Sequence, residues 1–280
     1  MKYKIEKNTV QETLILPLYA RKVCSELYPN LYRDETAVRL IDEIDYDFSE
    51  AEEKSHSLMQ RFGSLEVAVR QNDLAFEVRD YLKSHPNAAV VNLGCGLDST
   101  GRACDNGSCK IYNLDFPNVI SVRNELLPAG EREENIPCDL NNTEWFRKID
   151  SSSGAVFFAS GVFYYFLTEQ VKTLVQKMAD AFPGDVLVFD AANRAAVKMI
   201  AKTWLKSAKI KDVGAYFAVS DAKSELSLWD SRLQVTSRGY MLGYNDLKGP
   251  SIGGFFHFLA RVGDGMMKMQ IVKIRFGGKQ

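Results

Sequence analysis

Short apolar runs alternate with helical stretches along much of the chain after His85, and this alternation constrains the fold more than any other feature. The segments "AAVVNL", "KIYNL", "AVFFAS" and "DVLVFDA" are brief and largely unalternated, as expected for strands that are buried on both faces. Between the third and fourth run, "LTEQVKTLVQKMADAF" has helical spacing, with Thr168 as the expected N-cap and Pro183-Gly184 as the stop. The pattern predicts a parallel sheet with right-handed helical crossovers, an α/β fold.

The two ends of the chain differ from this middle part. Before His85 the segments "ETAVRLIDEI" and "SLEVAVRQNDLAFEVRDYLK" have helical periodicity, so residues 1–85 are expected to form a helical cap on a core of residues 86–280, within one large domain. Helices are also expected around residues 195–208 and 220–233. Near the C-terminus, "FFHFLARVGDGMMKMQIVKIRF" predicts two strands joined by Gly263-Asp264-Gly265, an antiparallel hairpin that completes the sheet.

Composition excludes several classes of function. The 35 Lys and Arg residues nearly balance the 36 Asp and Glu residues, for a net charge of -1, which argues against nucleic acid or an anionic membrane as the main partner. The five cysteines form no C-x-x-C pair and the three histidines are far apart, so no metal site is expected. The N-terminal segment does not resemble a signal peptide, and no segment has the length of a membrane span. A cytoplasmic globular protein is expected.

The first buried run ends in Gly94-Cys95-Gly96, and the second ends in Asp115. Ligands of an open α/β sheet bind at the carboxyl ends of the strands. Two glycines there allow a sharp turn and a close approach of backbone to ligand, and an acid about twenty residues later suits the hydroxyls of a ribose. The alternative is a plain tight turn, with Asp115 capping a helix that begins at Pro117.

A third acid, Asp139 in "NIPCDLNN", comes where the next strand is expected to end. Its carboxylate could accept a hydrogen bond from an adenine amino group, with the backbone amide of Leu140 serving a ring nitrogen. An Asx turn or N-cap is the other interpretation, and for Asp139 alone it is favoured. The nucleoside interpretation depends on all three features lying at successive strand ends.

The segments "NLGCGLDSTGR", "LDFPNVI", "PCDL" and "ASGVFYYF" together resemble the leucine carboxyl methyltransferase family, which includes O-methyltransferases of polyketide biosynthesis. The N-terminal "TLILPLYARKVCSELYPNLYRDETA" resembles the start of that family's domain, so the likeness covers nearly the whole chain. The resemblance implies a Rossmann-like class I methyltransferase fold with a mostly parallel seven-stranded sheet and a C-terminal antiparallel hairpin strand. It also implies S-adenosylmethionine as the cofactor.

The resemblance also implies residue roles. Arg21 and Arg70 match basic residues that hold the carboxylate of the methionine moiety, a task that suits an arginine fork. Ser160 departs from the family, because many members have an acid before the glycine that follows the fourth strand; its hydroxyl can still bond the cofactor's ammonium group, without the charge. The predicted cofactor-binding residues are Arg21, Arg70, Gly94, Cys95, Gly96, Asp115, Asp139, Leu140, Ser160 and Gly161.

The expected partner is a small, partly apolar methyl acceptor, and O-methylation is the expected reaction, with a protein terminus as the other acceptor known in the family. Tyr164 and Tyr165 are candidates for the substrate pocket, although core packing is favoured for such a run. His257 is a further pocket candidate for which a structural role is favoured. No catalytic residue is assigned. Two other functions remain open: an NAD-dependent oxidoreductase, which Ser99 in place of a third glycine argues against, and a non-catalytic nucleoside-binding relative, which Ser160 motivates.

Overall fold

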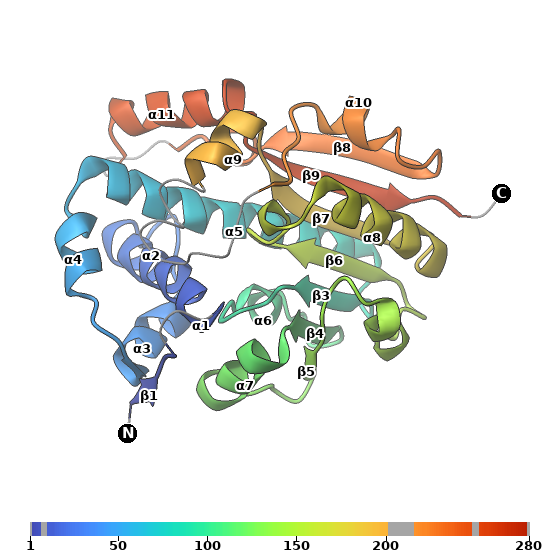
Figure 1. The fold of residues 1–280 in the computed structure, drawn as a ribbon, viewed down its shortest axis with the longest axis horizontal. Coiled ribbons are helices and arrows are strands. Elements are labelled where there is room, and N and C mark those ends of the chain that lie inside the picture. The colour runs from blue at the N-terminus through green and yellow to red at the C-terminus, as the bar shows by residue number, and fades with distance from the viewer. Residues whose placement is uncertain (1, 7–9, 201–215, 248–251, 279–280) are drawn as a thin grey trace.

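The computed structural model describes residues 2–6, 10–200, 216–247 and 252–278. Its central element is a seven-stranded sheet with the strand order β5-β4-β3-β6-β7-β9-β8. All neighbouring strands run parallel except β9, which is antiparallel to both β7 and β8 (Figure 1). The seven strands are β3 (Ala89–Leu93), β4 (Lys110–Asp115), β5 (Glu133–Pro137), β6 (Ala155–Ala159), β7 (Val186–Ala191), β8 (Leu233–Gly239) and β9 (Gln270–Phe276). The expected α/β fold and its mostly parallel sheet are confirmed.

Helices cover both faces of this sheet, and a separate pair of short parallel strands, β1 (Tyr3–Lys4) and β2 (Ile44–Asp45), lies near the N-terminus. The α-helices are α1 (Val10–Thr13), α2 (Ile15–Leu27), α3 (Glu35–Glu43), α4 (Ser49–Ser55), α5 (Leu58–Ser84), α6 (Thr100–Ala103), α7 (Pro117–Leu126), α8 (Thr168–Ala181), α9 (Arg194–Ile200), α10 (Ala222–Leu226) and α11 (Gly254–Gly265). Two 3₁₀ turns are η1 (Thr143–Lys148) and η2 (Phe163–Tyr165). In the described parts of the chain no helix is both long and apolar enough to cross a membrane.

Alternate residues of the central strands supply two separate cores. Val90, Val156 and Val188 face the side of the sheet that α5 covers, whereas Val91 and Phe157, with their neighbours in the adjoining strands, face the side of α8 and η1. All five residues of β3 are buried, which explains why its sequence shows no alternation. The parallel register pairs Leu93 of β3 with Leu114, one residue before the end of β4, and with Ala159, the last residue of β6, so three strands end at one edge.

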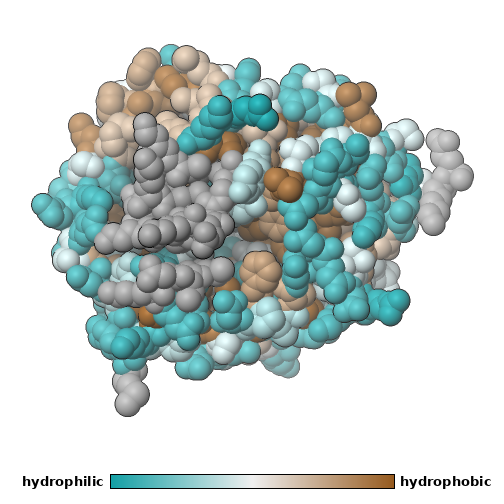
Figure 2. Space-filling view, in the orientation of Figure 1, coloured by the Kyte–Doolittle hydropathy of each residue, from teal (hydrophilic) through white to brown (hydrophobic). Residues whose placement is uncertain are grey.

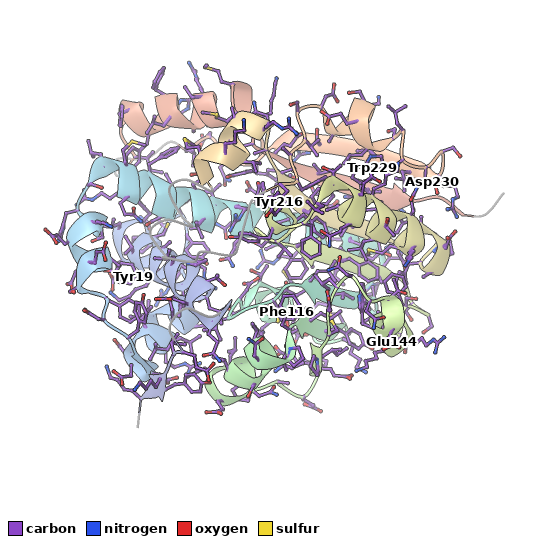
Figure 3. The ribbon with its side chains drawn as sticks, viewed as in Figure 1. Tyr19, Phe116, Glu144, Tyr216, Trp229 and Asp230 are labelled. Atoms are coloured by element: carbon purple, nitrogen blue, oxygen red, sulfur yellow. The ribbon has the colours of Figure 1, made fainter. Side chains whose placement is uncertain are left out.

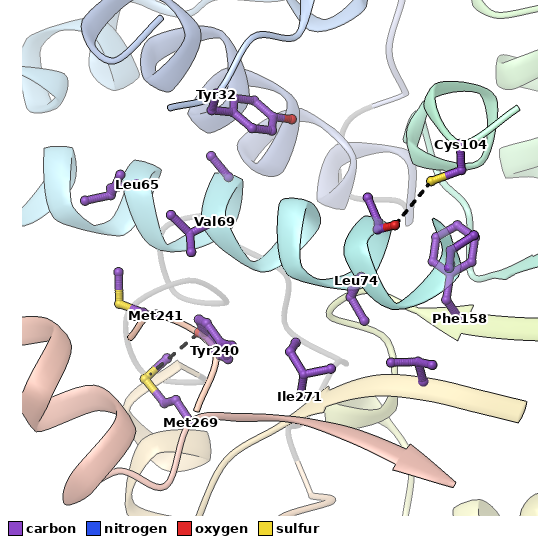
Figure 4. Close-up of a cluster of buried hydrophobic side chains, with 14 of the residues drawn as sticks. Tyr32, Leu65, Val69, Leu74, Cys104, Phe158, Tyr240, Met241, Met269 and Ile271 are labelled. Atoms are coloured by element: carbon purple, nitrogen blue, oxygen red, sulfur yellow. Dashed lines mark hydrogen bonds between the residues drawn. The ribbon is translucent and has the colours of Figure 1, made fainter. Parts of the chain in front are cut away.

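The long helix α5 links the N-terminal helices to the sheet. It packs against α2 on one side and against β6, β7 and β9 on the other, so its buried residues lie all round it rather than on one stripe. Figure 4 shows Leu65, Val69 and Leu74 along α5, with Ile271 of β9 on the sheet side. Because α5 is fixed on two sides, side chains that it directs beyond the ends of the strands are held in place.

The C-terminal region differs from the sequence-based expectation. Residues 254–265, expected to contain a strand, form α11, in which Phe256, Ala260 and Gly263 are buried at helical spacing. The aromatic composition favoured a strand, but the period of burial is that of a helix. The strand that pairs with β9 is instead β8, whose Leu233 and Val235 are buried while the intervening side chains are exposed.

Other expected helix boundaries shift. The helix expected over 220–233 is limited to α10, and of the helix expected over 195–208 the structure describes α9, the remainder lying outside the described residues. Thr168 is the first residue of α8 rather than its N-cap, and the backbone amide of Leu167 donates to the side chain of Gln170 (2.8 Å). In Figure 2 hydrophobic side chains gather over α11, where Phe255 and Phe258 are exposed.

Candidate active site

A cavity of about 480 Å³ lies at the carboxyl edge of the sheet. Its walls come from α1, α2 and α5 and from the segments that follow β3, β4, β5 and β6, together with Tyr216 and Tyr240. Figure 3 shows two lining residues, Phe116 just beyond β4 and Tyr216 on the other side of the strand ends. Eleven of the residues predicted from the sequence line the cavity: Arg21, Arg70, Gly94, Cys95, Gly96, Asp115, Leu140, Ser160, Gly161, Tyr164 and Tyr165.

Gly94 makes the turn after β3 in a conformation that other residues rarely adopt. Its φ is +67°, and a Cβ atom built on it would lie 2.6 and 2.9 Å from the two methyl carbons of Val162. A left-handed conformation and a close neighbour both favour glycine. The side chain of Cys95, next in the chain, is buried, and burial raises the pKa of its thiol. It is the backbone of this turn that faces the cavity.

Asp115 lies at the end of β4, and two backbone amides fix its carboxylate. Its Oδ2 accepts from the amide of Gly96 and its Oδ1 from the amide of Phe116, both at 2.8 Å. Pro117 begins α7 and Phe116 is its N-cap residue, with no side-chain capping hydrogen bond, so the alternative of Asp115 as a helix cap is wrong. Burial raises the pKa of Asp115, while the two amides act in the opposite direction. The carboxylate is therefore pre-oriented at the cavity edge.

Asp139 does not line the cavity. Its Oδ1 accepts from both the backbone amide (2.9 Å) and the side-chain amide (3.0 Å) of Asn141, and the residue is exposed. This is the Asx turn that was its other interpretation. The neighbours Cys138, Leu140 and Asn141 line the cavity instead. We call the part of the cavity walled by Gly94, Gly96, Asp115, Leu140 and Asn141 the strand-edge end.

The two predicted arginines have different surroundings. The guanidinium of Arg21 is buried, donates to Asp34 (2.9 Å) and to the carbonyl of Leu97 (3.0 Å), and lies 3.8 Å from Asp98. Arg70 pairs with Asp190 at the end of β7 (3.2 Å). Its Nε is buried and has no hydrogen-bond partner in the described parts of the chain. Arg70 lines the cavity and its side chain is 16% exposed, against 4% for Arg21, so Arg70 is the more accessible of the two arginines.

The surroundings of Arg70 were only partly predicted from the sequence. Gly161 has φ +70°, and a Cβ on it would lie 3.0 Å from the guanidinium nitrogens of Arg70. The amide of Gly161 donates to Asp190 (2.6 Å). Glu66 also lines the cavity, and its carboxylate accepts from the hydroxyl of Tyr240 (3.0 Å). We call the part walled by Glu66, Arg70, Ser160, Gly161, Tyr164 and Tyr240 the α5 end.

Glu66, Asp190, Tyr216 and Tyr240 were not predicted from the sequence. Glu66 lies one helical turn before Arg70, and the i, i+4 spacing was a usable signal. Tyr240 follows β8, a strand that was not expected, so no sequence pattern placed it. Of the three pocket candidates, Tyr164 is buried and Tyr165 is 39% exposed, and both line the cavity. His257 lies on α11 and is not part of the lining.

The fold and the cavity define a class: a doubly wound α/β protein with a nucleoside-type turn and acid at the carboxyl edge of its sheet. Comparison with known proteins gives the family. Residues 17–179 match the leucine carboxyl methyltransferase family, and the chain belongs to that family. Members of this family are methyltransferases, and the family's cofactor is S-adenosylmethionine. The family resemblance expected from the sequence motifs is confirmed.

Similar proteins carry related names. The chain is 27% identical over 183 residues to the tetracenomycin polyketide synthesis O-methyltransferase TcmP of Streptomyces glaucescens, and this alignment covers 65% of the chain and 66% of that protein, just under two thirds of its length. A solved structure from Thermobifida fusca, described as a methyltransferase, has a TM-score of 0.57 at 15% identity and covers 92% of this chain and 94% of that one. The plantazolicin methyltransferase BamL, solved with S-adenosylhomocysteine, has a TM-score of 0.52 at 13% identity, with 96% and 98% covered. At these identities the two structures establish the fold.

The residues at the cavity fit this cofactor. The turn at Gly94 leaves no room for a Cβ, the carboxylate of Asp115 is fixed by backbone amides at the cavity edge, and the partly exposed guanidinium of Arg70 lines the cavity. A nucleoside needs the first two features, and an amino-acid carboxylate needs a donor such as the third. Among the residues that the structure describes, no cluster of three or more His, Cys, Asp or Glu side chains could hold a metal ion.

Proposed function

We propose that this protein transfers the methyl group of S-adenosylmethionine to an oxygen atom of a small, partly apolar molecule. The observation that carries the proposal is the continuity of one cavity. It runs from the strand-edge end, with its glycine turn and fixed carboxylate, to a wall rich in aromatic side chains. Oxygen as the acceptor atom is supported by the name of TcmP, an O-methyltransferase.

Each wall of the cavity takes a role in this proposal. Asp115 accepts hydrogen bonds from the ribose hydroxyls, and Leu140 and Asn141 border the adenine, to which the sequence also assigns Asp139. Arg70 donates to the carboxylate of the methionine moiety, because its guanidinium lines the cavity and is partly exposed. Arg21 shared that predicted role, but its guanidinium is occupied by Asp34 and Leu97. We therefore assign Arg21 to holding the segment after β3 in position.

The acceptor occupies the aromatic part of the cavity. Phe116, Tyr165, Phe166 and Tyr216 line it, and apolar walls with a few polar groups are typical of small-molecule sites. Tyr164 also lines the cavity, and burial raises its pKa well above the usual value, so its hydroxyl stays protonated. A small molecule is thus preferred over a protein terminus as the acceptor.

Positioning is the main catalytic task of the chain. The bound cofactor supplies a sulfonium-activated methyl group, which an acceptor oxygen displaces in line. The side chains fix the two reactants at close distance and exclude water, which accounts for much of the rate in such reactions. The helical cap over residues 1–85 contributes Arg21, Glu66 and Arg70 to the cavity, which supports its assignment as part of one domain with residues 86–280. Location in the cytoplasm stays a prediction.

Calorimetric titration with S-adenosylhomocysteine and, separately, with NADH tests the proposal. We expect the first to bind and the second not to bind. A transfer assay with S-adenosylmethionine labelled in its methyl group, run against matched panels of phenols and carboxylic acids, then identifies the acceptor class. Binding of NADH alone would contradict the proposed function, and binding of S-adenosylhomocysteine without transfer to any acceptor would favour the non-catalytic relative.

A further inference from the structure

The charged side chains that line the cavity are Arg21, Glu66, Arg70, Asp98 and Asp115. Each of them has a partner within the protein. Arg21 is paired with Asp34. Asp98 accepts from the side chain of Gln71 (2.8 Å) and the amide of Thr100 (2.7 Å), and Asp115 accepts from two backbone amides at the strand-edge end. Glu66 and Arg70, whose partners are Tyr240 and Asp190, are the oppositely charged pair at the α5 end of the cavity.

Glu66 and Arg70 lie four residues apart on α5, so their side chains share one face of the helix. Such a pair commonly forms an ion pair, but no ion pair with a nitrogen–oxygen distance within 4.0 Å joins these two in the described structure. Arg70 pairs with Asp190 (3.2 Å), and Glu66 accepts from Tyr240 (3.0 Å). The wall therefore presents a positive and a negative group side by side, each held by a different neighbour.

Buried groups hold both side chains in place. Tyr240 is 2% exposed and its hydroxyl also lies 4.0 Å from the sulfur of Met269; Figure 4 shows it on the side of α5 that faces β9. Arg70 lies against Gly161, whose amide donates to Asp190. The spacing of the two charges is thus set by the packing of α5 on the sheet edge, and it does not depend on flexible surface side chains.

The amino-acid part of S-adenosylmethionine is a zwitterion, with an ammonium and a carboxylate on the same carbon. We propose that Glu66 binds this ammonium group while Arg70 binds the carboxylate, so that α5 recognises the zwitterion with two side chains one helical turn apart. The inference rests on the proposed function. Ser160, which lines the same end, can add a neutral hydrogen bond, but Glu66 supplies the negative charge.

The protonation state of Glu66 supports this assignment and provides a second test. Burial raises the pKa of Glu66 to about 7, opposed by the hydrogen bond from Tyr240 and the charge of Arg70. Asp190 and Asp264 raise the pKa further, and Tyr164 also faces this group. An ammonium partner favours the carboxylate form. Binding should therefore release a proton near pH 7, and affinity should increase as the pH rises from 6 to 8.

The experiment is calorimetric titration of the full chain with two ligands, S-adenosylhomocysteine and methylthioadenosine. The second has the same nucleoside and sulfur but lacks the amino-acid ammonium and carboxylate. At pH 8 we expect Glu66→Gln to lower the affinity for S-adenosylhomocysteine about tenfold and to change the affinity for methylthioadenosine less than twofold. Glu53→Gln, an exposed residue of α4, is the matched control and should change neither. Adding Ser160→Glu to Glu66→Gln should restore most of the lost affinity.

The outcomes separate the inference from the proposed function. An unchanged affinity of Glu66→Gln for S-adenosylhomocysteine, or equal weakening of both ligands, would overturn the role of Glu66 at the ammonium. Titration of the wild-type chain in two buffers of different ionisation enthalpy measures the proton release without any variant; no release near pH 7 would likewise overturn it. If the wild-type chain binds neither ligand, the proposed function itself fails.

Discussion

The two ends of the cavity are built by different means. At the strand-edge end the backbone determines the geometry: Gly94 turns at φ +67° and two main-chain amides fix Asp115. At the α5 end, side chains from three distant segments meet, Glu66 and Arg70 from α5, Asp190 from β7 and Tyr240 from beyond β8. The first end depends on local geometry that a short motif encodes. The second depends on the packing of a helix against a sheet, which no motif encodes.

The largest effect should come from removing the conformational freedom at the strand-edge end. Gly94→Ala places a Cβ 2.6 Å from a methyl carbon of Val162 in a left-handed backbone conformation. The strain and the overlap together should lower the free energy of unfolding by about 3 kcal/mol. They should also lower the affinity for S-adenosylhomocysteine at least tenfold. Chemical denaturation and calorimetry measure the two effects.

Gly184→Ala is the matched control, because Gly184 has φ +94° but nothing within 4 Å of the position of a Cβ. It should cost only the strain, about 1 kcal/mol, and leave the binding unchanged. Equal losses in the two variants would show that the contact with Val162 is not the limiting constraint at this turn.

The α5 side of the molecule should respond to pH through Asp73. Its Oδ1 accepts from Asn245 (3.0 Å), its Oδ2 is buried without a partner in the described parts of the chain, and burial raises its pKa to about 9. Because this pKa is raised on folding, the associated stability is complete below about pH 4 and is lost as the pH rises towards 9. The free energy of unfolding should fall by at most about 1.4 kcal/mol per pH unit from this group.

Asp73→Asn removes the titrating carboxyl group. Between pH 6 and pH 8 the free energy of unfolding of this variant should therefore fall by about 2 kcal/mol less than that of the wild-type chain. Urea denaturation at each pH gives the comparison, with Glu53→Gln as an exposed control. Parallel pH profiles for wild type and variant would mean that Asp73 is charged in the folded protein across this range. In that case the hydrogen-bonded pair of Asp73 on α5 and Asn245 would not make the stability of the protein depend on pH.

Asp115→Ala probes the strand-edge end directly. The ribose loses its acceptor and the amides of Gly96 and Phe116 lose theirs, so S-adenosylhomocysteine should bind at least tenfold more weakly, about 1.4 kcal/mol. The fold should survive, since the carboxylate lies at the edge of the core. Asp139→Ala is the paired variant. A loss below twofold there would assign Asp139 to its Asx turn, and a loss equal to that of Asp115→Ala would restore its predicted contact with adenine.

The sequence alone could bring the residues of the strand-edge end together because the information there is local. A buried strand, two glycines and an acid after the next strand follow one another within thirty residues, and parallel pairing brings their ends together without further information. The fold class followed from the same alternation. Asp139 shows the limit of this inference. It does follow a strand end, but the spacing of residues in the sequence does not reveal the local hydrogen bonds to Asn141 that hold its side chain outside the cavity lining.

The α5 end was only half predicted, for physical reasons. Arg70 was found through the family resemblance, whereas Glu66 one turn earlier looked like any solvated residue of an amphipathic helix. Tyr240 follows β8, which is an edge strand with only two buried side chains, and the aromatic run at 255–258 looked more strand-like than β8 itself. Long-range packing overrides such local propensities, and the sequence gives no measure of that packing.

The smallest predicted effect concerns the hydroxyl of Tyr240 at the α5 end of the cavity. Tyr240→Phe removes the hydroxyl that donates to Glu66 at 3.0 Å and leaves the ring in its buried place. That hydrogen bond lowers the pKa of Glu66, so in the variant Glu66 should stay protonated to higher pH. The variant should therefore bind S-adenosylhomocysteine about threefold more weakly at pH 7. The difference should shrink by pH 9, where Glu66 is ionised in both proteins, while methylthioadenosine should bind both alike. A loss that is the same at every pH would place the effect of Tyr240 in the packing of the wall and not in the charge of Glu66.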